Sequence, residues 1–208
     1  LMTLASCDSR KTAGENPFFT EWDTPHGVPP FDKILPEHFM PAFERGMSLH
    51  EAEIDAITSN KDEATFENTI LAYDNAGQML AQTELVFGML CAAETNDRMQ
   101  TLQEQAMPLL AAHRDKIRLD DKLFVRVKEV YDRRAALGLD AEQMRLLQKT
   151  YDSFVRAGAL LGTEQKARLK EINGQLSLTA VKFGNNILAE NNNFVLELKS
   201  DELDGRPA

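Results

Sequence analysis

The 208-residue sequence has few of the residues that mark several large classes of protein. Two cysteines, eight prolines, eleven glycines and 7% aromatic residues fit a helical globular protein and argue against a disulfide-rich or disordered chain. The 23 lysines and arginines are outnumbered by 33 aspartates and glutamates. The resulting net charge of −10 argues against nucleic acid as a partner and against a polybasic membrane patch. No apolar run approaches the roughly 20 residues that a membrane-spanning helix needs.

The length is that of one large domain, or of one domain with a tail. Apolar residues recur at steps of three and four through most of the chain, which is the period of an amphipathic helix. We therefore predict an all-α fold, a multi-helix bundle of about six helices. The first helix is expected over about 36–59, and typical N-cap residues predict that the others begin at Thr65, Asn96, Asp120 or Asp121, Asp140 and Thr163.

Proline and glycine positions predict where the helices are interrupted. Residues 16–35 are expected to be an extended segment, because the four prolines within them disfavour helix. Gly77 is expected to break or kink the second helix, and Pro108 is expected to bend the third.

The end of the sequence predicts one short strand. The last helix is expected to reach about Glu190, with a turn at 191–193. Residues 194–199 then alternate between apolar and other side chains, which is typical of a strand. A single strand cannot form a sheet, and an exposed strand edge is a liability in a complete protein. We therefore expect the protein to continue beyond Ala208.

The start of the sequence is expected to lie outside the helical fold. The run Leu-Ala-Ser-Cys at 4–7 resembles a bacterial lipobox, so residues 1–15 are interpreted as a signal-peptide remnant, the lipobox and a polar tether. Cys7 is the predicted lipidation site of a periplasm-facing lipoprotein of the cell envelope. The alternative is a chance cysteine at a frayed terminus, which would leave a cytoplasmic location open. Cys91 lies in a helical apolar run and is predicted to be a small buried hydrophobic residue.

The four histidines do not form a recognisable metal motif. A zinc-peptidase helix needs His-Glu-x-x-His, whereas His50-Glu51 is followed at the second histidine position by Ile54. We interpret His50-Glu51 as part of a solvated helix face. The sequence also has no glycine-rich phosphate loop and no Gly-x-Ser-x-Gly nucleophile motif. We therefore assign no catalytic residue and no metal ligand within residues 1–208.

Several motifs nevertheless resemble, in order, the start of one enzyme family. They are Asn16-Pro17-Phe18, Trp22 to Asp32, Ile34 to Met47, Thr65 to Ile70, Phe154 to Ala159 and Lys182 to Asn186. They are similar to the N-terminal part of bacterial peptidyl-dipeptidases, also called dipeptidyl carboxypeptidases, which are zinc metallopeptidases of the thimet-oligopeptidase type. No single motif is decisive, but the ordered set covers nearly all of 16–205.

The resemblance implies a helical enzyme with a deep channel, which releases dipeptides from the C-termini of oligopeptides. It implies that zinc is held by the two histidines of His-Glu-x-x-His and a downstream glutamate in the C-terminal half, which this sequence does not reach. Residues 16–208 would be the N-terminal lid or wall of the channel, inactive alone, with oligopeptides and its own C-terminal catalytic domain as partners. No substrate-binding residue is assigned. The alternative is a catalytically inactive, lipid-anchored helical module that binds peptides or has a structural role.

Overall fold

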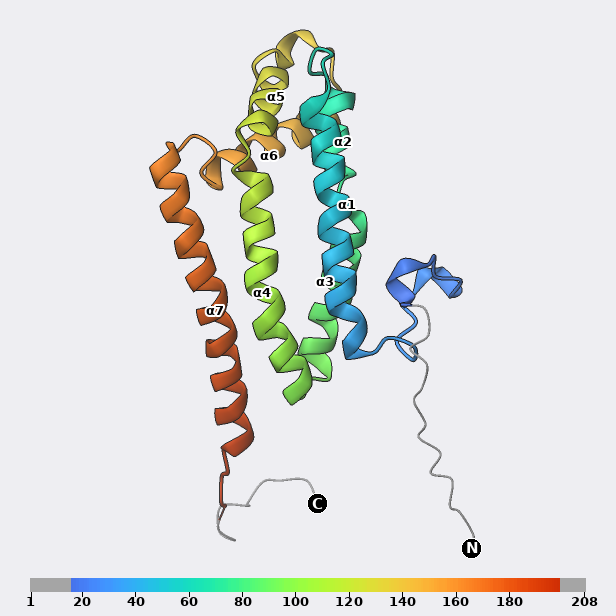
Figure 1. Ribbon diagram of the computed structural model, residues 1–208, viewed down its shortest axis with the longest axis vertical. Helices are drawn as coiled ribbons and strands as arrows, with labels where there is room; N and C mark the ends of the chain where they lie inside the picture. The colour runs from blue at the N-terminus through green and yellow to red at the C-terminus, as the bar shows by residue number, and fades with distance from the viewer. Residues whose placement is uncertain (1–15, 199–208) are drawn as a thin grey trace, which may run out of the picture.

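The computed structural model describes residues 16–198, and within them every regular element is helical (Figure 1). The predicted all-α class is confirmed. The long helices are α1 (Phe39–Ser59), α3 (Gln78–Ala93), α4 (Asp97–Arg118), α5 (Asp121–Asp132), α6 (Ala141–Arg156) and α7 (Thr163–Asn193). The short helical elements are η1 (Pro17–Phe19), η2 (Pro25–Gly27), η3 (Pro36–His38), η4 (Phe66–Leu71), α2 (Ala72–Asp74) and η5 (Arg134–Ala136). No described helix combines the length and the apolar content that crossing a membrane requires.

Local capping decides where most helices begin. The side chains of the predicted cap residues Thr65, Asn96, Asp120 and Asp140 each accept a hydrogen bond from the backbone N–H three positions on. These bonds satisfy donors that the first helical turn leaves free. The predicted cap at Thr163 is wrong by one residue. Gly162 is the N-cap of α7, and its N–H donates to the side-chain oxygen of Gln165.

The predicted interruption at Gly77 is confirmed. Gly77 has φ of +75°, a conformation in which a side chain would be strained, and it separates α2 from α3. Its N–H donates to the Glu53 carboxylate of α1 at 2.7 Å. The break therefore has a fixed geometry, and it turns the chain so that α3 lies against α1.

Two predicted segments differ from the structure. Residues 16–35 are not extended throughout, because η1 and η2 fold within them; in each, proline occupies the first helical position, where its missing N–H costs nothing. The predicted turn at 191–193 is instead the last turn of α7. Residues 194–198 are in no helix or strand, and Lys199 lies outside the described residues. A strand needs a ladder partner, and none lies within 16–198.

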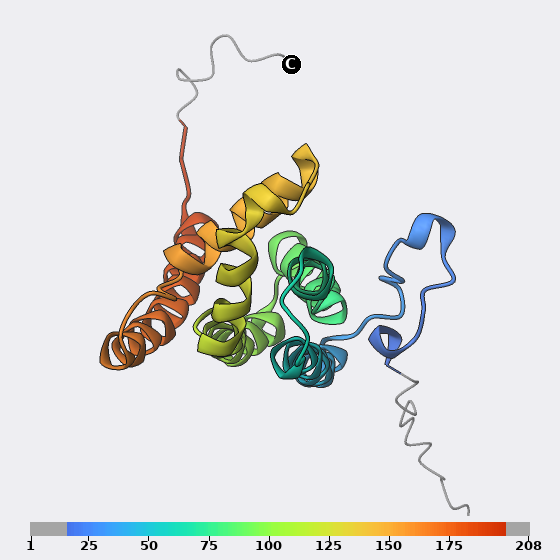
Figure 2. The same cartoon turned by 90° about the horizontal axis from the view of Figure 1, so that it is seen from above.

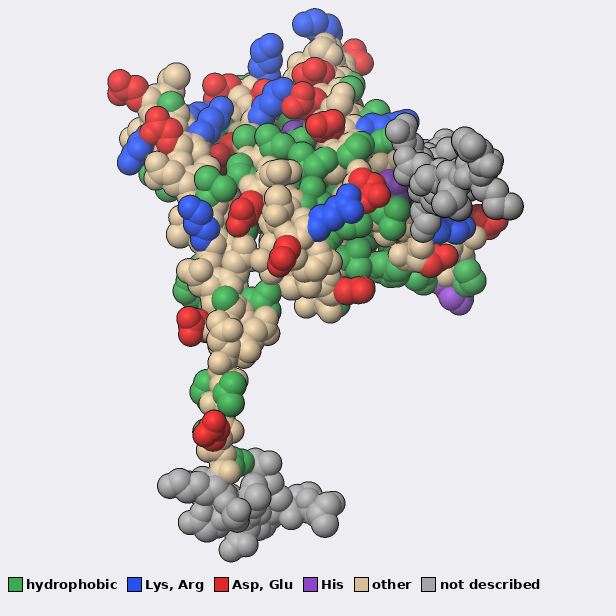
Figure 3. Space-filling model, turned by 60° about the horizontal axis from the view of Figure 1, so that its bottom comes forward, with side chains coloured by type: hydrophobic (Ala, Val, Ile, Leu, Met, Phe, Trp, Pro, Cys, Tyr) green, Lys and Arg blue, Asp and Glu red, His purple; other side chains and the backbone are tan. Residues whose placement is uncertain are grey.

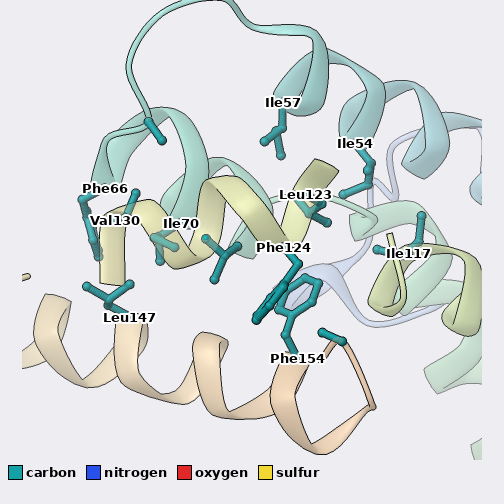
Figure 4. Close-up of a cluster of buried hydrophobic side chains, with 13 residues drawn as sticks. Ile54, Ile57, Phe66, Ile70, Ile117, Leu123, Phe124, Val130, Leu147 and Phe154 are labelled. Carbon is teal, nitrogen blue, oxygen red and sulfur yellow. The ribbon is translucent and has the colours of Figure 1, made fainter. Parts of the chain in front are cut away.

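Two hydrophobic clusters hold the bundle together. One joins η1, α1, α3 and α4 around Phe39, Phe43 and Phe87, whose rings lie 5.0–6.2 Å apart. The other joins the opposite ends of α1 and α4 to η4, α5 and α6, and Figure 4 shows Phe124 against Phe154 at its centre. Because both clusters share α1 and α4, these two helices form the spine of the molecule.

Helix α7 has a different environment. Figures 1 and 2 show α4 between α7 on one side and α1 with α3 on the other. Nothing described covers the side of α7 that faces away from α4, and only Lys166 and Val181 of its 31 residues are buried. In Figure 3 the C-terminal part of the described chain projects from the body of the molecule.

Candidate functional site

Two histidines from different helices meet in the interior. His50 of α1 and His113 of α4 lie with Nδ1 of the first 3.0 Å from Nε2 of the second, which is a hydrogen bond between the two rings. His113 is 5% exposed and His50 is partly buried. The interpretation of His50-Glu51 as a solvated helix face is therefore wrong for His50. The ring turns inward because its partner on α4 offers a hydrogen bond inside the bundle.

A carboxylate and an ammonium group extend this pair toward the surface. Oε1 of Glu51 lies 3.5 Å from Nδ1 of His113, and Oε2 of Glu51 lies 2.8 Å from Nζ of Lys116. The hydrogen bond from Lys116 lowers the pKa of Glu51 below its ordinary value. Nδ1 of His113 is buried and has no hydrogen-bond partner among the described residues. The groups therefore form a connected series, Lys116, Glu51, His113 and His50, in which His113 is the most deeply buried.

Burial keeps both histidines neutral over a wider pH range than free histidine. The pKa of His50 is lowered by burial and then by the neighbouring His113. The pKa of His113 is also lowered by burial, although Glu51 opposes the shift. Two imidazoles in hydrogen-bond contact cannot both take up a proton without repulsion. Chemically, the pair is a neutral donor and acceptor unit at pH 7.

The space beside the pair is small. A pocket of about 190 Å³ is lined by both histidines together with residues of α2, α3 and α4. Typical pockets for drug-sized ligands measure about 300–1,000 Å³. The pocket therefore has room for a few water molecules or a small ion, and it does not fit an oligopeptide.

The residues present do not fit a zinc centre. A catalytic zinc site needs three protein ligands, and within residues 16–198 no three His, Cys, Asp or Glu side chains converge on one point. Ile54, which stands where a zinc-peptidase helix has its second histidine, is buried in the hydrophobic cluster of Figure 4. The inward side of this helix turn is therefore packing surface.

The remaining histidines and Cys91 have structural surroundings. His38 is buried, and its Nδ1 accepts a hydrogen bond from the N–H of Leu35 at 3.1 Å, which fixes the start of η3. His26 is exposed in η2. Cys91 packs at the edge of the cluster around Phe39, and burial raises the pKa of its thiol to about 11. The predicted lipidation site Cys7 lies outside the described residues.

The contact between His50 and His113 could not be read from the sequence. The two residues are 63 positions apart, on helices whose mutual orientation no local pattern specifies. The one available signal is that His113 falls among the apolar positions of α4, between Leu110 and Ile117, where a histidine needs a buried partner.

Comparison with known proteins gives relatives over most of the chain. No family model matches it. It is 41% identical over 176 residues to dipeptidyl carboxypeptidase of Escherichia coli K12, a match that covers 85% of this chain and 26% of the relative. It is 38% identical over 174 residues to dipeptidyl carboxypeptidase of Salmonella typhimurium, covering 84% of this chain and 26% of the relative. Oligopeptidase A of Escherichia coli K12 is 24% identical over 165 residues, covering 79% of this chain and 24% of the relative. The chain thus spans about a quarter of the length of these relatives.

Proposed function

The chain matches an N-terminal part of the dipeptidyl carboxypeptidase family, and from this premise we propose that it is the helical lid domain of a zinc-dependent peptidyl-dipeptidase. The parent enzyme would release dipeptides from the C-termini of oligopeptides. The observation that carries the proposal is the 41% identity over 176 residues to a relative of that name. Because no cluster within 16–198 fits zinc, we assign the metal and the catalytic groups to a C-terminal domain outside this chain.

The packing of the bundle supports a lid role. Helices α1, α3 and α4 share a continuous hydrophobic cluster, and interiors packed in this way deform little. A stiff helical layer can exclude folded proteins from a channel by size alone while it admits extended peptides. In this proposal residues 16–198 form a wall that keeps folded proteins out of the channel, and they take no part in bond cleavage.

The exposed apolar stripe of α7 supports the presence of a second domain of the same protein beside this helix. Apolar residues recur along α7 at steps of three and four, and three of them, Ile172, Phe183 and Ile187, have 43%, 65% and 45% of their surface exposed. Exposed apolar patches of this kind mark interaction surfaces. We assign this stripe to contact with the C-terminal catalytic domain of the same protein.

We further propose that Cys7 anchors the protein to the cell envelope, facing the periplasm. The support is the lipobox-like run at 4–7 followed directly by polar residues. Metabolic labelling with a radioactive fatty acid tests this assignment. Label should enter the native protein and be absent from the Cys7→Ser variant; equal labelling of both, or none in the native protein, contradicts it.

The enzymatic proposal is tested on the full-length protein. Oligopeptides with a free C-terminus and the same peptides with an amidated C-terminus are incubated with it, and the products are identified by mass spectrometry. We expect dipeptides from the free C-terminus, loss of activity with a chelator and recovery with zinc. Release of single amino acids, activity that resists chelation, or full activity of residues 1–208 alone would contradict the proposal.

A further inference from the structure

A groove between α4 and α7 gathers positive charge in an acidic protein. Its volume is about 370 Å³, and its lining includes Arg114 and Arg118 of α4 and Arg156 at the end of α6. Asp115 is the one carboxylate in the lining. The whole sequence carries a net charge of −10, so a local excess of arginine is the reverse of what composition predicts.

The fold brings the three arginines together. Arg114 and Arg118 are four positions apart on α4, so they lie one helical turn apart on the same face. Arg156 is the last residue of α6, where the helix dipole favours a cation. Helix α7 then passes along α4 and closes the other side of the groove with Leu169 and Leu176.

Much of the hydrogen-bonding capacity of these arginines is unused. Neither Arg118 nor Arg156 has a carboxylate within 4.0 Å among residues 16–198, although Arg118 also lies beside the Tyr73 hydroxyl. The nearest carboxylate oxygen of Glu84 is 3.8 Å from Arg114. The acid in the groove is already engaged, because Nδ2 of Asn173 donates to Asp115 at 2.8 Å.

We propose that this groove is a binding site for an acidic peptide that carries apolar side chains between its carboxylates. Guanidinium groups bind carboxylates through paired hydrogen bonds, and three of them can hold more than one carboxylate. On α7, Leu169 is half-buried and Leu176 and Ala180 are exposed. These side chains offer contact to an apolar side chain of the peptide. A groove of about 370 Å³ is within the usual range of ligand sites.

The overall negative charge does not prevent this binding. Fields from exposed charges are screened beyond about 8 Å at physiological salt, so a short peptide responds mainly to the arginines it touches. A long polyanion would extend beyond the groove onto the acidic surface. A short acidic peptide therefore fits this surface better than a nucleic acid does.

Binding at this groove can be measured directly, so its test needs no turnover. The probe is a fluorescein-labelled peptide that alternates leucine and glutamate over six residues, with both ends blocked. Its matched control replaces each glutamate by glutamine, which keeps the shape and removes the charge. We measure the affinity of the full chain for both by fluorescence anisotropy and expect the glutamate peptide to bind at least about tenfold more tightly.

Single variants locate the site. Arg118→Gln and Arg156→Gln should each weaken binding of the glutamate peptide about tenfold. The matched control is Arg168→Gln, because Arg168 is an exposed arginine of α7 that pairs with Glu171 at 2.7 Å and does not line the groove. This control should bind like the native chain. Circular dichroism and unfolding midpoints verify that all three variants fold.

Two further arms separate a peptide site from a general anion site. A peptide with glycine in place of every leucine should bind several-fold more weakly, and millimolar inorganic phosphate should not displace the original peptide. Equal binding of the glutamate and glutamine peptides, or unchanged binding in both groove variants, overturns the proposal. Full displacement by phosphate, or equal binding of the glycine peptide, also overturns it. None of these outcomes bears on dipeptide release, which is measured separately.

Discussion

Helices α4 and α7 lie side by side, yet they are held in the structure in different ways. Helix α4 has neighbours on both sides, and it buries Met99, Leu102, Ala106, Leu110, Ala111, His113 and Ile117. Helix α7 is nine residues longer and buries two. Its contacts with α4 include polar pairs, such as Asn173 with Asp115 and Asn185 with Glu104 at 3.3 Å.

The two helices show that an apolar period predicts a helix better than it predicts what the helix packs against. In α4 most of the apolar residues that recur at steps of three and four are buried. In α7 the expected stripe, which includes Ile172 and Ile187, is mostly exposed, while Val181 from outside that stripe is buried against the bundle. Leu176 of this stripe lies at the groove beside α4, whereas Ile172, Phe183 and Ile187 are exposed outside that groove, which is the reason we assign these three to contact with another domain.

The largest expected effect comes from the same substitution made in both helices. Leu110 is 1% exposed and Leu176 is 62% exposed. We expect Leu110→Ala to lower the free energy of unfolding by about 2–5 kcal/mol, because it removes buried contacts and leaves a cavity. We expect Leu176→Ala to change it by less than about 0.5 kcal/mol. Urea unfolding of residues 1–208 measures both.

Phe183→Ala tests the proposed neighbour of α7, since Phe183 is 65% exposed and lies outside the groove beside α4. Its cost should be near zero in residues 1–208 and should rise in the full-length protein, because the side chain would then be buried by the second domain. A cost that stays near zero there would contradict the assignment of the α7 stripe to an interdomain contact, whereas the cost of Leu110→Ala should stay the same.

A second comparison uses two glycines that share a conformation and differ in surroundings. Gly77 and Gly138 have φ of +75° and +64°. Alanine should cost about 1–2 kcal/mol at either position for the backbone conformation alone. At Gly77 the added carbon would lie 2.9 Å from Nδ1 of His50, whereas at Gly138 it would meet nothing within 4 Å.

We therefore expect Gly77→Ala to cost a further 1–3 kcal/mol, roughly, through overpacking and loss of the contact between His50 and His113. Thermal unfolding of the two variants, with nuclear magnetic resonance of the histidine rings, provides the measurement. Equal costs at the two glycines would show that the His50 ring can move aside freely.

The third prediction concerns pH and the histidine pair that joins α1 to α4. Both histidine pKa values are lowered in the folded chain from the ordinary value of 6.5. Below pH 6.5 the unfolded chain binds more protons than the folded chain. The histidine pair therefore makes its whole contribution to the free energy of unfolding above pH 6.5, and that contribution decreases as the pH falls below 6.5. Denaturation between pH 7.5 and pH 5 should show this loss.

Removing one member of the pair should reduce the pH dependence. In His113→Gln the slope of stability against pH below 6.5 should decrease, because one histidine with a lowered pKa is gone. His26→Gln is the control, since His26 is exposed in η2. An unchanged slope in His113→Gln would mean that other groups cause the loss of stability.

The sequence predicted local features well and long-range contacts poorly. The caps at Thr65, Asn96 and Asp140 and the break at Gly77 were predictable, because each depends on residues within one turn. The contact between His50 and His113 and the gathering of arginines beside α7 were not, because they depend on how helices cross. The strand predicted from Phe194 onward required a partner that lies nowhere in 16–198. The zinc expectation came from resemblance alone, and no three metal-ligating side chains converge within 16–198.

The last prediction compares glycine substitutions in the buried helix α1 and the exposed helix α7, where we expect the least change in stability. Gly46 of α1 and Gly184 of α7 both lie inside helices, where replacing glycine by alanine favours the helix by about 1 kcal/mol. At Gly46 the new carbon would lie 3.0 Å from the Cα atom of Leu80, so α3 would have to shift. At Gly184 nothing lies within 4 Å.

Gly184→Ala should therefore raise the stability of α7 by up to about 1 kcal/mol, while Gly46→Ala should lower the stability of the bundle. Hydrogen exchange followed by mass spectrometry is the suitable measurement, because α7 can open without unfolding of the rest. Protection should increase within α7 for Gly184→Ala and decrease across α1 and α3 for Gly46→Ala. If Gly184→Ala instead weakens protection, then residues outside 16–198 contact that face of α7. The face would then be exposed only when residues 16–198 are considered alone.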